Sequence, residues 1–536
     1  METNIDKEKR TNKSLLKSGT KLSVLVLISR ILGLIRQMTM SSFLGTGPLA
    51  DAFTTAFMLP NLFRRLFAEN SVTVAFIPTF NKYLQNYNDE GKKDKADIIE
   101  FLSSIFTLVS FATAVVVVLG IIFAPLIIKV FFSKIVDYDA AVFLTQIMFP
   151  YLFLISIAAF FQGILNGFKI FTPSGITPIL FNIITISATY FFAKPFGNPA
   201  VAMAYGVLIG GFVQAVFQLP FVLKTGFNFK FKNLKDTFLN DGTKQVLKLL
   251  GPTVIGVAAY QLNELVSTSL ATSTGLGIAS SLQYSLRLLE LLLGIFAVSI
   301  GTVILPDLSR LAAKKNWIQF QDLLLQSIKI IALITIPASF FSFLNGENII
   351  ILIYKNNRFN ENSVALTLGV FKLHIIGLFA IAANRIIAPA FYAQSDSKSP
   401  AAAGIICFGI NIILAFLLSM FFGGNGIAAA LTIAGFVNTI LLFIFLQKNK
   451  NIDIFRLVLP ALMFICKIFI FSVIASIPIY FFKEKIYFPF SNYGKIISQG
   501  VPLFLSFIVF ASIGIFLLFI CKDKTTFSAL DMLKKK

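Results

Sequence analysis

The chain alternates long apolar stretches with short polar or glycine- and proline-containing breaks along almost its whole length. A helix needs about 20 apolar residues to cross the hydrocarbon core of a bilayer, and about fourteen stretches meet that requirement. The stretches do not alternate between apolar and polar positions, which argues against a transmembrane β-barrel. The predicted spans are 22–43, 51–83, 99–131, 140–168, 174–196, 199–223, 245–271, 276–311, 318–345, 362–395, 399–422, 424–447, 457–482 and 497–521.

A weak internal repeat divides most of these spans into two halves. AFIPTFNKYL at 75–84 matches VILPDLSRLA at 303–312, which pairs Pro78 with Pro306 at an offset of 228 residues. Pro173 and Pro400 each follow a long apolar stretch and pair at an offset of 227. Six spans per half keep both halves in the same orientation and predict a cavity between them. Chance similarity of short apolar segments is the alternative explanation.

The predicted fold is an all-α polytopic membrane protein with about fourteen transmembrane helices. Two six-helix lobes surround a central cavity, and two further helices follow at the C-terminus. The expected division is a cytoplasmic N-terminal segment at 1–21, an N-lobe at 22–224, a cytoplasmic linker at 225–244, a C-lobe at 245–447, the last two spans at 448–521 and a cytoplasmic tail at 522–536.

Composition supports a membrane protein and excludes an ordinary soluble domain. The chain is 56% hydrophobic and 13% charged, with a mean hydropathy of +0.82. Its net charge of +21 comes largely from lysines between the spans, where they meet anionic headgroups, so we expect no nucleic-acid partner. Loops on the side of the termini carry about 29 Lys and Arg, against about 7 on the other side. This asymmetry predicts that both termini are cytoplasmic.

Charged residues inside the first two spans are the strongest functional signal. A charge at the centre of a bilayer costs about 3 kcal/mol, so these side chains are expected to face a hydrated cavity or an anionic ligand. An internal network of salt bridges is the alternative. The charged residues of this region are Arg30, Arg36, Asp51, Arg64, Arg65 and Glu69.

Helical spacing distinguishes the expected roles of the charged residues in the second span. Arg65 and Glu69 are four residues apart and are expected to pair, which leaves Arg64 to face the ligand. Asp51 opens the second span and is a candidate N-cap. Arginine binds phosphate through two parallel hydrogen bonds, so a cavity with surplus arginine suits a phosphate or diphosphate headgroup.

The second half carries fewer charges within its spans. Arg287 and Glu290 are three residues apart and are expected to pair, or Arg287 adds to the cavity. Glu264, in the seventh span, is a candidate cation or proton site, but neutralisation of Arg287 is the favoured interpretation. Arg385 is expected to extend toward the membrane surface.

Catalytic and metal-binding signatures are absent from the sequence. It contains no GxxxxGK[ST] phosphate loop, no HExxH and no GxSxG, so an enzyme is not indicated. Three cysteines lie in apolar segments without CxxC spacing, which predicts neither a metal site nor a disulfide framework. His374 lies next to Lys372 in an apolar segment and is expected to be packed or hydrogen-bonded rather than to carry protons.

The segments SRILGLIRQ, ADAF, LPNLFRRLFAEN and AFIP resemble the first two helices of the MurJ (MviN) family of lipid II flippases, in the MOP superfamily. The resemblance continues through FPYLFLISIAAFFQGILNGFKIFTPSGITPIL, SLRLLELLLGIFAVSIGTVILPDLS and APAFYAQSDSKSP. It implies a transporter that flips lipid II, an undecaprenyl-diphosphate-linked peptidoglycan precursor, to the outer leaflet of the bacterial cytoplasmic membrane. Alternating access would be driven by the membrane potential or by a sodium or proton gradient, without a cofactor.

The same resemblance implies roles for individual residues. The implied substrate-binding arginines are Arg30, Arg36, Arg64 and Arg287, and the supporting or gate residues are Asp51, Arg65, Glu69 and Glu290. Residues 448–521 would form a groove for the lipid tail. The implied sodium site in the second lobe, at Asn411 and Thr432, departs from the family pattern because the eleventh span carries no acid, and Glu264 is a separate ion-site candidate from its own position in the seventh span. Leu292 stands where the family usually has proline, which leaves the local helix bend open.

We expect a monomer that contacts lipid II and membrane lipids, with cell-wall synthesis proteins as candidate partners. Three alternatives remain on sequence alone. The first is a MOP-superfamily exporter of another polyprenyl-linked oligosaccharide or of drugs, although drug export requires acidic cavity residues for organic cations. The second is a membrane transferase acting on a polyprenyl phosphate, and the third is a scaffold for the cell-wall elongation machinery.

Overall fold

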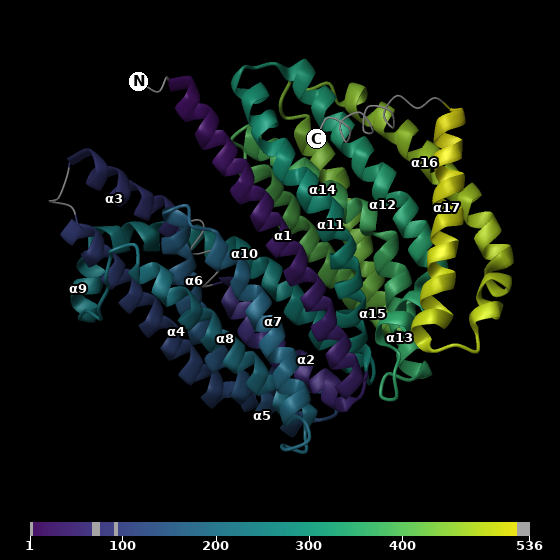
Figure 1. Cartoon of the computed structure of the whole chain (residues 1–536), viewed down its shortest axis with the longest axis horizontal. Helices are drawn as coiled ribbons and strands as arrows, with labels where there is room; N and C mark the ends of the chain where they lie inside the picture. Colours follow the sequence, from purple (N-terminus) through teal and green to yellow (C-terminus); the bar gives the residue numbers. More distant parts are fainter. Residues whose placement is uncertain (1–3, 67–74, 91–94, 522–536) are drawn as a thin grey trace. The chain divides into compact units, whose positions relative to one another are not determined.

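A computed structural model describes residues 4–66, 75–90 and 95–521 of the chain. This part of the chain forms helices and contains no strand, so the predicted all-α membrane fold is confirmed (Figure 1). It divides into two compact units, Met1–Leu276 and Gly277–Lys536. The expected cytoplasmic tail at 522–536 lies outside the described residues.

Unit 1 and unit 2 each consist of a series of helices joined by short connections. Unit 1 contains α1 (Asn4–Leu44), α2 (Pro48–Arg64), α3 (Ile77–Glu90), α4 (Lys95–Phe131), α5 (Tyr138–Met148), α6 (Pro150–Gly167), α7 (Thr172–Phe192), α8 (Pro199–Leu223), α9 (Leu234–Leu239) and α10 (Asp241–Thr274). Unit 2 contains α11 (Ile278–Ala313), α12 (Trp317–Tyr354), α13 (Glu361–Ile376), α14 (Leu378–Ala393), α15 (Lys398–Leu446), α16 (Ile454–Tyr487), the short turns η4 (Phe488–Phe490) and η5 (Ile496–Gly500), and α17 (Val501–Ile520).

Nine helical segments of the described chain are long and apolar enough to cross a membrane, or ten if α13 and α14 form one bent span. The chain is therefore a multi-pass membrane protein. The count of fourteen remains a prediction. The expected span 51–83 includes residues outside the description, and α10 and α11, which cover the expected spans 245–271 and most of 276–311, are not among the nine. Two further expected spans, 399–422 and 424–447, are joined in α15.

The backbone of α15 breaks at Gly423, between the two spans expected from the sequence. Gly423 has φ 55° and ψ −133°, which lie outside the helical region. A Cβ added at Gly426 would lie 2.2 Å from the carbonyl oxygen of Leu418, eight residues earlier. A straight helix separates such residues by about 12 Å, so the chain reverses direction at Gly423. The expected break between the eleventh and twelfth spans is thus confirmed.

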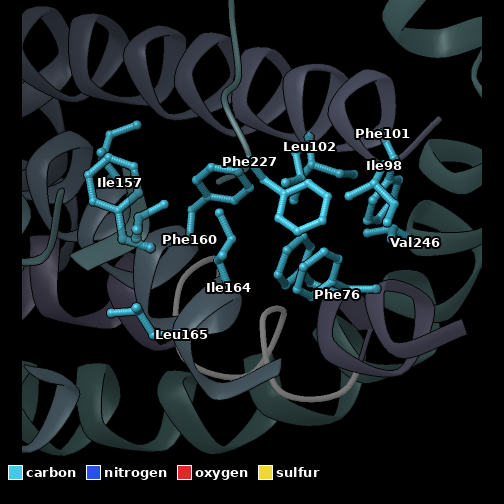
Figure 2. Close-up of a cluster of buried hydrophobic side chains, with 14 of the residues drawn as sticks. Phe76, Ile98, Phe101, Leu102, Ile157, Phe160, Ile164, Leu165, Phe227 and Val246 are labelled. Atoms are coloured by element: carbon cyan, nitrogen blue, oxygen red, sulfur yellow. The ribbon is translucent and has the colours of Figure 1, made fainter. Parts of the chain in front are cut away.

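Aromatic side chains fill the core of unit 1 between α3, α4, α6 and α8 (Figure 2). Phe76 stacks on Phe101, with ring centroids 5.8 Å apart, and Phe160 packs edge-on against Phe76 at 5.5 Å. Such pairs contribute about 0.5–1.5 kcal/mol each beyond the area that they bury. The cluster therefore fixes these four helices against one another.

The segment between α8 and α9 packs against this core rather than crossing as a free connection. Phe227 is buried within the cluster of Figure 2, and Phe229 packs edge-on against Phe160 at 5.6 Å. The backbone N–H of Lys230 donates to Ser103 Oγ at 3.0 Å, and that of Lys232 donates to Thr107 Oγ1 at 2.9 Å. These bonds join the expected linker, 225–244, to α4.

The boundary between the units falls after α10, whereas the sequence-based division places a linker at 225–244 and begins the C-lobe at residue 245. α10 packs against α2, α3, α4 and α9, so it belongs to the compact body of unit 1. The functional division into lobes remains a prediction.

Unit 2 is built around α12, which packs against α11, α13, α14, α16 and α17. Ala332 and Ile336 of α12 form a buried cluster with Phe464 and Ile468 of α16. A second cluster joins α16 to α17 through Ala475, Ile479 and Phe510. Helix packing in a membrane depends on such close van der Waals contacts, since lipid chains are as apolar as leucine. The two C-terminal helices are therefore attached to α12.

We predict that Gly423→Ala destabilises the protein by about 1–3 kcal/mol, because a side chain is strained at this backbone conformation. Thermal unfolding of the purified protein measures the effect. Gly404→Ala in the same element is the matched control, since no heavy atom lies within 4 Å of its added Cβ. Equal unfolding temperatures for the two variants would show that Gly423 is not needed for the reversal.

Candidate functional site

The first two helices meet at the expected short turn. α1 ends at Leu44, Gly45 has φ 63°, and α2 begins with Pro48 at its first position. The N-cap of α2 is Gly47, so the expectation that Asp51 caps this helix is wrong, because the helix begins three residues earlier. Asp51 is buried in the first helical turn, where a negative charge is favoured by the helix dipole.

Arg36 lies among aromatic rings contributed by helices distant in sequence. Its Cζ is 5.2 Å from the ring centroid of Phe181 in α7 and 5.8 Å from that of Phe57 in α2. Tyr151 of α6 extends this cluster, 5.6 Å from Phe181 and 6.4 Å from Phe57. A guanidinium within about 6 Å of a ring face is attracted by the ring electrons. The rings thus stabilise a cation in an apolar setting.

Arg30 lies on α1 about one and two-thirds turns before Arg36 and is half-buried. The position of this part of α1 is set by α7, because Asn182 Nδ2 donates to the carbonyl oxygen of the adjacent Ser29 at 3.2 Å. Arg30 and Arg36 therefore both lie on the part of α1 that packs against α7.

Arg64 and Arg65 differ in their partners. Arg64 Nε donates to Asn61 Oδ1, one turn earlier, at 2.8 Å. Arg65 Nη1 forms an ion pair with Glu264 Oε2 of α10 at 2.5 Å and donates to Gln261 Oε1 at 3.4 Å. The ion pair of Arg65 with Glu264 is in line with its predicted supporting role.

The partner of Arg65 could not be read from local spacing. Glu69, its expected partner, lies outside the described residues. Glu264 was expected to neutralise Arg287, but its ion pair within unit 1 is with Arg65, 199 residues away in sequence. A pairing over that separation depends on how α2 packs against α10, which no helical periodicity encodes.

Arg287 in α11 forms the ion pair that its spacing predicts. Its Nη1 donates to Glu290 Oε2 at 2.8 Å. The Nε atom of the same guanidinium is buried and has no hydrogen-bond partner among the described residues. A buried donor without an acceptor costs about 1–3 kcal/mol. Arg287 therefore presents an N–H group that an incoming anionic oxygen could satisfy.

Buried side chains support the helical turn that carries Arg287. The ring of Tyr284 lies 5.0 Å from that of Tyr354 and 5.2 Å from that of Phe359. Ser285 Oγ and His374 Nδ1 are 2.7 Å apart and join α11 to α13. The expectation that His374 is packed and hydrogen-bonded is confirmed. These contacts hold the backbone of α11 in place beside Arg287.

Of the residues of the candidate ion site, Asn411 and Thr432 lie on α15 and Glu264 lies on α10. Thr432 of α15 donates its hydroxyl to the carbonyl oxygen of Leu373 at 2.7 Å, and Asn411 is buried in the preceding part of α15. Glu264 is in unit 1, paired with Arg65. Within the described residues, no group of three or more His, Cys, Asp or Glu side chains could hold a metal.

Two residues left without an assigned role are now placed. Lys372 of α13 has its Nζ 5.4 Å from the ring centroid of Phe343 in α12. Arg385 is exposed on α14, which agrees with the expectation that it extends toward the membrane surface.

Taken together, both units carry arginines on apolar helices. In unit 1, Arg64 donates to the amide oxygen of Asn61, and in unit 2 the Nε of Arg287 is buried without an acceptor among the described residues. Guanidinium groups bind phosphate oxygens through directed hydrogen bonds. The arrangement is therefore suited to binding rather than to breaking bonds.

Comparison with known proteins gives a consistent result along the whole chain. A family model described as lipid II flippase MurJ matches residues 40–496. A protein of Treponema pallidum (strain Nichols), named as a probable lipid II flippase MurJ, is 47% identical over 98% of this chain and 99% of its own length. One from Buchnera aphidicola subsp. Acyrthosiphon pisum with the same name is 31% identical over 85% of this chain and 90% of its own.

Solved structures show the same relationship at the level of the fold. Lipid II flippase MurJ in an inward closed conformation aligns with a TM-score of 0.74 and 25% identity, over 92% of this chain and 98% of that one. An inward-facing multidrug resistance MATE transporter of the MOP superfamily aligns with a TM-score of 0.63 and 15% identity, over 80% and 97% of the two chains. The second likeness concerns the fold alone.

We predict that a double-mutant cycle with Arg65→Gln and Glu264→Gln gives a coupling free energy of about 1 kcal/mol in thermal unfolding. Partial burial strengthens this pair, since the two side chains are 28% and 34% exposed. The control is the more exposed pair Arg310 and Asp307, for which the coupling should stay below about 0.5 kcal/mol. Equal coupling in both cycles would contradict a supporting role for the Arg65–Glu264 pair.

Proposed function

The chain belongs to the lipid II flippase MurJ family, and from this membership we propose that it carries lipid II from the inner to the outer leaflet of the cytoplasmic membrane. It acts as a transporter rather than an enzyme. The substrate is an undecaprenyl-diphosphate-linked peptidoglycan precursor, so the protein serves cell-wall biogenesis.

The observation that carries the site assignment is the open Nε of Arg287. Glu290 holds the other side of the guanidinium, and a diphosphate oxygen that reached the buried Nε–H would supply the acceptor that the described residues do not provide. We propose Arg30, Arg36 and Arg64 as the further substrate-binding arginines. In support, Arg36 lies against the rings of Phe57 and Phe181, and Arg64 donates to the amide oxygen of Asn61. Asp51, Arg65, Glu69 and Glu290 are proposed as supporting residues.

The membrane potential is the proposed source of energy. An interior-negative potential is worth about 2.3 kcal/mol per charge per 100 mV. It pushes an anionic headgroup outward and draws an empty cationic cavity back toward the inside, so both steps run downhill. We propose alternating access between the two halves, without a cofactor. Sodium or proton coupling, with Asn411 and Thr432 as sodium-site candidates, is a further option.

We propose that the lipid tail lies along residues 448–521. Helices α16 and α17 expose large apolar side chains, among them Phe455, Phe504 and Phe516. Such a surface allows the polyprenyl chain to stay in the hydrocarbon while the headgroup crosses.

The proposed orientation places both termini in the cytoplasm, on the basis of the lysine and arginine asymmetry between loops. We propose a monomer in contact with membrane lipids, with cell-wall synthesis proteins as candidate partners.

We predict that Arg30→Ala, Arg64→Ala and Arg287→Ala each abolish growth in a strain depleted of its own lipid II flippase, because each removes a ligand of the diphosphate. Growth complementation is the measurement, with membrane levels of the variant checked by immunoblot. Arg310→Ala is the matched control, since Arg310 is exposed near the end of α11 and should complement fully. Wild-type growth from all three site variants would remove the site assignment.

A further inference from the structure

A second group of charges lies in unit 2, away from Arg287, around Lys483. This side chain extends from near the end of α16 to α12, where its Nζ donates to the carbonyl oxygen of Leu344 at 3.1 Å. Lys372 reaches α12 from α13, with its Nζ 5.4 Å from the ring centroid of Phe343. Glu347, on the next turn of α12, and Lys372 both interact electrostatically with Lys483. Two ammonium groups and one carboxylate thus gather around one turn of α12.

A polar group without a partner completes this cluster. The ring centroid of Tyr487 lies 5.9 Å from Lys483 Nζ. The hydroxyl oxygen of Tyr487 is buried and makes no hydrogen bond to any described residue. A buried hydroxyl without a hydrogen-bond partner is costly, so a ligand that accepts a hydrogen bond from it would be stabilised here. We call Lys372, Lys483, Glu347 and Tyr487 the Lys483 cluster.

The Lys483 cluster lies toward the C-terminal ends of α12 and α16. Glu347 is seven residues before the end of α12 and Lys483 four residues before the end of α16, about 10 and 6 Å along their helices. Lys372 starts deeper in α13, but a lysine side chain extends toward the surface. Lys355 and Glu361, which form an ion pair, mark the end of the helices on this side. Headgroups occupy the outer 5–8 Å or so of each leaflet.

The charges of the cluster match one class of lipid. Two ammonium groups and a phenol hydroxyl all donate hydrogen bonds and suit a phosphate, whereas the exposed Glu347 suits a cation beside it. We propose that the Lys483 cluster binds the headgroup of an amino-phospholipid, with the phosphate at Lys372, Lys483 and Tyr487 and the primary ammonium at Glu347. The lipid belongs to the leaflet at the C-terminal end of α12, which is the outer leaflet in the orientation proposed above.

Phospholipid titrations of the purified full-length protein test this site by native mass spectrometry. Phosphatidylethanolamine should bind at least about tenfold more tightly than phosphatidylcholine, whose trimethylated nitrogen cannot donate to Glu347. In the double variant Lys372→Gln with Lys483→Gln, phosphatidylethanolamine should lose tenfold or more in affinity, since each lysine contributes about a factor of five. The matched control, Lys314→Gln with Lys315→Gln, removes the same charge from exposed lysines at the opposite end of α12 and should bind like the wild type.

Glu347→Gln separates the two parts of the headgroup. It should abolish the preference for phosphatidylethanolamine over phosphatidylcholine and leave binding of phosphatidylglycerol intact, because the phosphate ligands remain. Lys483→Arg should keep the affinity, and thermal unfolding in phosphatidylcholine should show that every variant is folded.

Unchanged phosphatidylethanolamine affinity in the double glutamine variant would overturn the proposal, as would a preserved preference in Glu347→Gln. If the double glutamine variant lost affinity only for a polyprenyl diphosphate, the cluster would instead belong to the binding site of the transported lipid.

Discussion

The structure depends on the cost of placing a guanidinium group in an apolar helix. Several kinds of contact offset that cost. Arg36 lies against aromatic rings, Arg64 donates to an amide oxygen, and Arg65 and Arg287 pair with carboxylates. These contacts differ in whether they add a negative charge beside the guanidinium group. A carboxylate neutralises a guanidinium group, whereas an aromatic ring or an amide oxygen stabilises it without adding a negative charge.

Much of the architecture follows from the distribution of apolar residues. The span expected at 199–223 coincides with α8, and the break expected after residue 422 is the reversal at Gly423. Local pairs are equally accessible, since Arg287 and Glu290 are neighbours on any helix. Sequence fails where a contact depends on packing between distant helices, as with Arg65 and Glu264 or the ring of Phe181 beside Arg36. The prediction that Asp51 caps α2 is wrong for a local reason, because the helix begins at Pro48, three residues earlier.

Fold and function are supported by different observations. The likeness to multidrug transporters, at 15% identity, reflects a shared helical architecture and says little about cargo. Whole-length similarity at 47% identity establishes the family, and the anionic headgroup that we propose as the cargo suits arginine side chains. A drug exporter would need acidic side chains for organic cations, and the acids Glu264 and Glu290 are held by arginines.

The segment that follows α8 has a practical consequence for anyone who modifies this protein. In sequence it looks like a tolerant place for a fluorescent tag or a protease site, because it is polar and lacks helical periodicity. Phe227 and Phe229 instead pack into the aromatic core, and the backbone N–H groups of Lys230 and Lys232 donate to Ser103 and Thr107. An insertion there would remove Phe227 from the buried cluster and break the hydrogen bonds to α4, so this segment is a poor position for a reporter.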